Sequence, residues 1–138
     1  MTIFYKDQRL DHMSRGDAYL WSKFLDKYPD LFTSFKYDVH VGESVKLPED
    51  SPDWLRISAN ALGRKRIDVV AESIKSTTII EVRVQAKSNV IGDLIAYRYL
   101  YVTTYSPIKP VTTMLVSDSI DVDTLICLND LGIPYFIV

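Results

Sequence analysis

Apolar residues recur along this chain at two spacings, one typical of helices and one typical of strands. The helical period runs through residues 14–30, 88–102 and 121–132. Pro29 and Gly132 close the first and third of these segments, and Ser88 is a suitable cap for the second. Alternating or short apolar runs predict strands over residues 34–42, 64–73, 77–85, 111–118 and 133–138.

The order of these segments determines the architecture that we expect. It runs helix, strand, strand, strand, helix, strand, helix, strand. The first three strands can form a meander, and each later strand is reached through a helix, which favours parallel crossovers. We therefore predict an α/β fold in which helices flank a mixed β-sheet. A chain of 138 residues can bury one core but not two comfortable ones. We expect a single domain over residues 1–138, with residues 1–14 as a flexible N-terminal arm.

Composition narrows the classes of function. The formal net charge of −2 gives no general attraction to nucleic acid or anionic lipid, so any such contact must use a local patch. The single cysteine, Cys127, excludes an internal disulfide, suits a reducing compartment, and is expected as a small core residue. His12 and His40 do not stand at zinc-ligand spacing.

No membrane contact is expected, because no apolar run reaches membrane-spanning length. The first residues are also too polar for a signal peptide. These features predict a cytoplasmic protein or, for a viral chain, a protein of the host cytoplasm or virion.

The two central strands place a row of polar side chains beside an apolar one. In residues 77–87 the polar row is Glu81, Arg83, Gln85 and Lys87. A tight turn centred near Ile74–Lys75 lets both strands bury their apolar rows together and places Asp68 directly across from Glu81. Two facing carboxylates repel each other, but a divalent cation turns that repulsion into coordination, because magnesium takes its protein ligands mainly from carboxylates. The plainer alternative is that both acids point to solvent.

The spacing of these acids resembles the signature of the PD-(D/E)XK nuclease superfamily. Asp68 is followed, after twelve residues, by Glu81-Val82-Arg83. The stretch "IGDLIAYRYLY" is similar to the helix that many RecB-like members carry after their lysine strand, with its Gln-x-x-x-Tyr pattern. The element order also matches, and the resemblance runs from about Arg15 to Val138. Two residues depart from the pattern, since Arg83 replaces the lysine and Asp93 replaces the glutamine, while Tyr97 remains four residues on.

The resemblance implies a restriction-endonuclease-like fold and metal-dependent hydrolysis of DNA. Asp68 and Glu81 would hold Mg²⁺ or Mn²⁺. Arg83 would stabilise charge at the phosphate, because arginine stays protonated and cannot act as a base. Supporting roles fall to Gln85, Tyr97 and Asp17. Asp17 is either a further contact to metal or water, or an acid that caps the first helix.

A basic cluster next to these acids is the candidate DNA contact. Phosphate-binding roles are predicted for Arg64, Lys65, Arg66, Lys87 and Arg98. Basic residues of this kind are also common on solvated surfaces. Lys65 points to the opposite face in the expected register.

Two other functions remain open on the sequence. One is a catalytically silent member of the same fold, for example of a virus or other mobile element, that serves as a structural or protein-binding module, alone or as an oligomer. In that protein Arg83 forms an ion pair with Asp68 or Glu81 where a metal would otherwise sit. The other is an unrelated small α/β binding domain.

Overall fold

The computed structural model describes residue 10 and residues 12–42, 47–57 and 65–138. Its helices are α2 (Arg15–Lys27), α4 (Asn89–Tyr105) and α5 (Val122–Leu131), and residues 53–57 are also helical. Its strands are β1 (Ser34–Val41), β2 (Lys65–Glu72), β3 (Thr77–Ala86), β4 (Val111–Ile120) and β5 (Tyr135–Ile137). This is the predicted order of elements.

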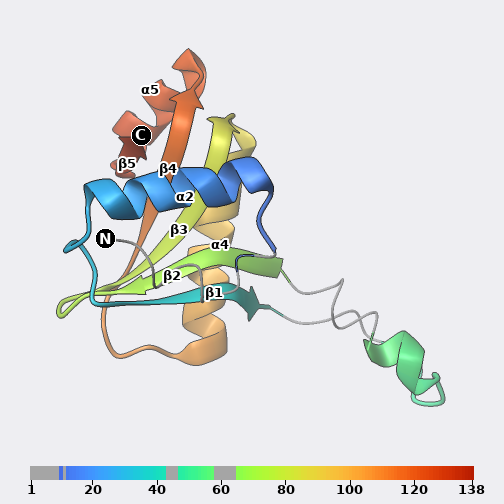
Figure 1. Ribbon diagram of the computed structural model, residues 1–138. Coiled ribbons are helices and arrows are strands. Elements are labelled where there is room, and N and C mark those ends of the chain that lie inside the picture. The colour runs from blue at the N-terminus through green and yellow to red at the C-terminus, as the bar shows by residue number, and fades with distance from the viewer. Residues whose placement is uncertain (1–9, 11, 43–46, 58–64) are drawn as a thin grey trace.

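The strands form one mixed sheet in the order β1-β2-β3-β4-β5 (Figure 1). β1, β2 and β3 pair antiparallel as a meander, whereas β4 and β5 add parallel through α4 and α5. The predicted topology is therefore confirmed. Val69 pairs with Ile80, so the β2–β3 turn is centred between Ile74 and Lys75, as the apolar rows require.

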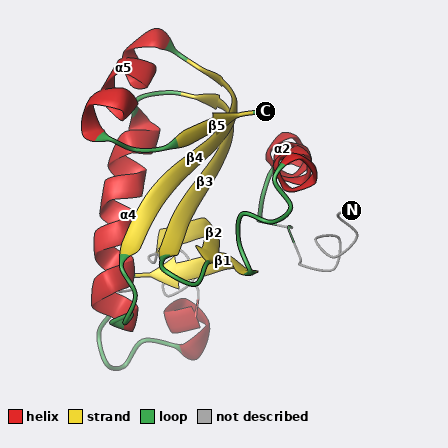
Figure 2. Cartoon of the chain, turned by 90° about the vertical axis from the view of Figure 1, so that its left-hand side faces the viewer, coloured by secondary structure: helices red, strands yellow, loops and turns green. Residues whose placement is uncertain are grey.

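Helices cover both faces of the sheet, with α2 on one side and α4 and α5 on the other (Figure 2). On the α2 side, the apolar face of the helix packs on even residues of β3, including Ile80 and Val82. On the other side, Leu94 and Leu128 pack with Ile79. Since both faces are buried, β3 carries no solvent-facing row in its first half, and its polar residues there, Thr77, Thr78 and Glu81, are enclosed.

Two local predictions are wrong. Ser88 does not cap α4 with its side chain, because its own backbone is helical and its hydroxyl lies 3.2 Å from the Thr124 hydroxyl of α5. Cys127 is exposed rather than part of the core, because α5 buries only Thr124 and Leu128. Gly132 does end α5 in the left-handed conformation that glycine allows (φ 69°).

The start of the described chain lies against the body of the protein. Leu10 and Met13 pack on the α2 side of the core, and Ser14 caps α2 by accepting a hydrogen bond from the Asp17 amide. Of the predicted arm, residues 1–9 and 11 lie outside the described residues. Over the described ranges, no helix is long and apolar enough to cross a membrane.

Candidate active site

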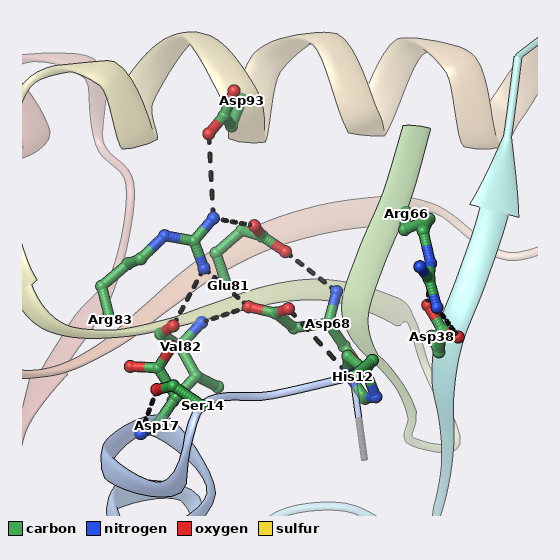
Figure 3. Close-up of polar contacts among 10 residues, drawn as sticks. All are labelled: His12, Ser14, Asp17, Asp38, Arg66, Asp68, Glu81, Val82, Arg83 and Asp93. Carbon is green, nitrogen blue, oxygen red and sulfur yellow. Dashed lines mark hydrogen bonds and ion pairs between the residues drawn. The ribbon is translucent and has the colours of Figure 1, made fainter. Parts of the chain in front are cut away.

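The hydrogen-bond ladder between β2 and β3 ends at Val69–Ile80, although both strands continue. Beyond that pair, side-chain carboxylates accept the hydrogen bonds of backbone amides in place of the neighbouring strand (Figure 3). The Asp68 amide donates to Glu81 Oε2 at 3.0 Å, and the Val82 amide donates to Asp68 Oδ2 at 3.0 Å. We call this place, where Asp68 and Glu81 face each other, the β2–β3 opening.

Two residues from the start of the chain complete the opening. Asp17 Oδ1 accepts a hydrogen bond from the Val84 amide at 3.1 Å, and His12 Nε2 lies 3.2 Å from the Asp68 carbonyl oxygen. Gly16 allows the close approach of α2, because a Cβ at that position would lie 3.0 Å from Val84 Cγ2. Side chains thus satisfy backbone groups that would otherwise be left without partners.

The Arg83 guanidinium bridges the two carboxylates. Its Nη1 donates to Asp68 Oδ2 at 2.7 Å and to the Val82 carbonyl at 2.9 Å, and its Nη2 donates to Glu81 Oε1 at 2.6 Å. Nη2 also lies 3.8 Å from Asp93 Oδ2 on α4 (Figure 3). We call the paired bonds to Asp68 and Glu81 the Arg83 fork. The fork is the ion pair expected for a silent member of the fold.

Negative charge exceeds positive charge at this buried position. Only 1% of the Glu81 side chain is exposed, and its burial, followed by the charge of Asp68, raises its pKa to about 8 despite Arg83. Burial acts to lower the pKa of Arg83, but the charges of Glu81 and Asp68 outweigh it and raise that pKa above its ordinary value. Burial and the charges of Glu81 and Asp93 raise the pKa of Tyr97 to about 12.

The structure therefore brings together five of the residues singled out in the sequence, namely Asp17, Asp68, Glu81, Arg83 and Asp93. Tyr97 lies near enough to feel their charges. The solvent-pointing alternative is wrong for Glu81, which is buried, and Asp68 is largely covered as well. Asp17 stands in the first turn of α2, where the helix-end alternative places it, and its carboxylate also accepts a hydrogen bond from a strand amide, while Ser14 supplies the side-chain cap.

The predicted DNA contacts are more scattered. Lys65, Lys87 and Gln85 are exposed, and Arg64 lies outside the described residues. Arg66 makes a two-pronged ion pair with Asp38 at 2.6 and 2.5 Å. Arg98 donates from Nε to the Val111 carbonyl at 2.7 Å. Val111 pairs with Thr77, four residues before Glu81 on β3, so Arg98 is directed to another part of the sheet.

Sequence reasoning missed His12. Its side chain is 7% exposed, and Nε2 lies 3.9 Å from Asp68 Oδ1 as well as near the Asp68 carbonyl. Within the described part of the chain its Nδ1 is buried without a hydrogen-bond partner. No spacing rule could have found this contact, because 56 residues separate His12 from Asp68.

The donor set suits a hard divalent cation. Carboxylate oxygens are the ligands that magnesium prefers, and it usually takes one or two of them together with water and substrate phosphates. Two nitrogens of one guanidinium contact Asp68 and Glu81, so the two carboxylates lie close enough for one cationic group to bridge them. Among the described residues, no group of three or more His, Cys, Asp or Glu side chains forms a metal site. A divalent cation in place of the guanidinium would therefore have Asp68 and Glu81 as its two protein ligands.

Comparison with known proteins identifies the fold. No family model and no curated protein matches the chain. A structure described as an EndoMS–dsDNA2 complex matches with a TM-score of 0.52 and 14% identity, covering 91% of this chain and 46% of that one. A repair endonuclease from Pyrococcus abyssi matches with a TM-score of 0.52 and 13% identity, covering 91% and 47%. The chain spans less than half the length of these structures. The predicted restriction-endonuclease-like fold is confirmed, and the chain shares it with EndoMS and with the repair endonuclease from Pyrococcus abyssi.

Proposed function

We propose that this chain is a single nuclease-like domain that hydrolyses phosphodiester bonds in DNA with Mg²⁺ or Mn²⁺. The observation that carries the proposal is the pair of carboxylates, Asp68 and Glu81, which face each other at the β2–β3 opening and share one cation. An excess of acids at a buried position costs folding energy unless a cation compensates it. The shared fold with EndoMS and the repair endonuclease makes a divalent cation and a phosphodiester substrate the natural complement.

Each residue of the site has a proposed role. Asp68 and Glu81 hold the divalent cation, which when bound activates water and neutralises phosphate charge. Arg83 supplies a fixed positive charge to the phosphate and, because it does not lose its proton, takes no part as a base. Asp17 holds the β3 backbone in place through the Val84 amide. Tyr97, whose raised pKa keeps it protonated, offers a hydroxyl donor to the substrate.

The test is cleavage of supercoiled, linear and single-stranded DNA with Mg²⁺ or Mn²⁺. Asp68→Asn and Glu81→Gln keep acceptors for the backbone amides but remove the charge, so we expect cleavage to disappear. Arg83→Ala should cost a factor of about 100 or more, as expected for one preorganised electrostatic contact. Arg83→Lys should keep or raise activity. Asp130→Asn, on the exposed end of α5, is the matched control and should cleave like the wild type.

Cleavage that continues in excess chelator would rule out this mechanism. Wild-type activity that survives Arg83→Ala unchanged would rule out the role given to Arg83. These two results are independent, because one concerns the cation and the other concerns the phosphate.

One observation favours a second function, a catalytically silent module of the same fold. The Arg83 fork already occupies both carboxylates with short hydrogen bonds of 2.7 and 2.6 Å. A guanidinium so placed can stabilise the opening permanently and leave the domain to bind DNA or a protein partner. Inactivity of the wild type, Arg83→Lys and Arg83→Ala on every substrate would select this function.

A further inference from the structure

Arg83 has carboxylate partners on two sides, and those on one side are more deeply buried than the one on the other. Its fork reaches inward to Asp68 and Glu81, whose side chains are 16% and 1% exposed. On its outer side Nη2 lies 3.8 Å from Asp93 Oδ2, too far for a hydrogen bond, and Asp93 is 38% exposed. The guanidinium therefore has a second carboxylate within about one ångström of bonding distance, on the side that leads to solvent.

The balance of charge around Arg83 indicates a role for Asp93. Three carboxylates, those of Asp68, Glu81 and Asp93, contact one guanidinium within ion-pair distance. A divalent cation bound by Asp68 and Glu81 would balance those two acids. The displaced guanidinium would then be neutralised by Asp93. Each acid has a countercharge in that arrangement, whereas in the arrangement observed here the acids outnumber the cation.

We propose that Arg83 is a built-in cation that competes with the divalent metal for Asp68 and Glu81, and that Asp93 is the positioning residue that receives Arg83 on displacement. This inference rests on the proposed function, because it requires a divalent cation at the β2–β3 opening. It gives Arg83 two positions. The inner one closes the metal site, and the outer one, on Asp93, leaves the guanidinium partly exposed beside the opened site.

Competition of this kind lowers the apparent metal affinity by the fraction of molecules that are open. If the inner position is favoured about ten to one, the apparent dissociation constant rises about tenfold. Asp93 stabilises the outer position only. Its removal should therefore weaken metal binding when Arg83 is present and have little effect when Arg83 is absent.

The experiment is a double-mutant cycle in which Mn²⁺ binding is measured by titration calorimetry. The four proteins are the wild type, Arg83→Met, Asp93→Asn and the double variant. We expect Arg83→Met to bind about tenfold tighter than the wild type and Asp93→Asn to bind several-fold weaker. In the Arg83→Met background, Asp93→Asn should change the affinity less than twofold. The coupling between the two sites is the quantity tested.

Two controls separate displacement from general charge effects. Asp123→Asn removes an exposed acid from the first turn of α5 and reports the effect of lost charge alone. Arg83→Lys keeps the charge but replaces the planar fork with a single ammonium, and it should bind Mn²⁺ with an affinity between those of the wild type and Arg83→Met. If Arg83→Met does not fold, the cycle is run with Arg83→Gln, which also lacks the positive charge.

The outcomes are distinct. An equal loss of affinity from Asp93→Asn in both backgrounds makes Asp93 an ordinary ligand or charge and overturns the inference, while the proposed metal site stands. Equal affinities of the wild type and both Arg83 variants overturn the competition. No Mn²⁺ binding by any of the proteins overturns the proposed function and this inference with it.

Discussion

Glu72 and Glu81 lie on the two strands of one pair, β2 and β3, near opposite ends of their shared ladder, and their carboxylates have opposite properties. At the turn end, Glu72 Oε1 lies 2.7 Å from both the Thr77 hydroxyl and Lys109 Nζ, and its side chain is 23% exposed. Burial acts to raise the pKa of Glu72, but the bonds from Lys109 and Thr77 outweigh it and lower that pKa. At the opening, Glu81 has a pKa raised to about 8.

The difference shows what separates a structural ion pair from a candidate reactive site. Glu72 is a single acid that pairs with Lys109, lies within reach of the charge of Lys36 and has access to water, so its charge is balanced. Glu81 is enclosed, and one arginine is shared among it, Asp68 and Asp93. Burial without charge balance is the arrangement that shifts pKa values at functional sites.

The largest expected effect on stability comes from removing the Arg83 guanidinium from the β2–β3 opening. Arg83→Ala leaves two acids facing each other in a buried setting, and we expect a loss of about 3–5 kcal/mol in the free energy of unfolding, as for other broken buried pairs. Urea denaturation at pH 9 in chelator measures it. Divalent cation should restore part of the loss. A loss under 1 kcal/mol would mean that Asp68 and Glu81 do not depend on Arg83.

The raised pKa of Glu81 should make the stability of the protein depend on pH. Because the folded pKa of Glu81 lies near 8, above its ordinary 4.5, folded protein binds this proton more tightly than unfolded protein. Its contribution to stability should therefore fall as pH rises from 4.5 to 8, by up to about 1.4 kcal/mol per pH unit. Glu81→Gln should remove that slope, measured by urea denaturation in chelator.

In the same denaturation assay, the contribution of Glu72 to stability should change with pH in the opposite direction. Its lowered pKa stabilises the fold above its ordinary value of 4.5, and this stabilisation is lost as pH falls through the folded pKa. Glu72→Gln should therefore be less stable than the wild type above about pH 4.5, and the two stabilities should converge as pH falls through the folded pKa. A change of the same sign and pH range in both variants would contradict the comparison.

The smallest expected effect on stability comes from removing Lys109, the cation at the turn end of the β2–β3 pair. Lys109 is 36% exposed and pairs with Glu72 while donating to the Ser73 carbonyl at 2.8 Å. Lys109→Ala should cost no more than about 1 kcal/mol, because exposed ion pairs contribute little. The measurement is the same denaturation at pH 7. A cost equal to that of Arg83→Ala would show that the two ends are alike.

Much of the fold could be predicted, because apolar period and turn position are local properties. The period-2 rows of β2 and β3, with the turn between Ile74 and Lys75, were enough to place Asp68 across from Glu81. The same local rules predicted helices on the faces of the sheet, but not that α2 and α4 would enclose the polar row of β3. That enclosure, and with it the burial of Glu81, depends on how distant elements pack.

The details of the site needed the folded chain. The contacts of His12 and Asp17 join residues 56 and 67 positions from their partners, which no spacing encodes. Ser88 fits a capping pattern but has Thr124 of another helix as its partner. The choice of Arg83 between Asp68 and Glu81 was left open by the sequence, and the structure shows that one planar guanidinium takes both.

The carboxylates at the opening also act as substitutes for missing strand partners, and this limits what mutation can remove. The amides of Asp68, Val82 and Val84 depend on Glu81, Asp68 and Asp17 in that order. A lineage that abandoned catalysis would still lose stability if any of these acids drifted to an apolar residue, because a buried amide would lose its acceptor. Selection for folding alone would therefore retain a side-chain acceptor at each of the three positions, whether the acid or its amide counterpart. Acceptors that survive at these positions in a descendant would therefore be no record of turnover.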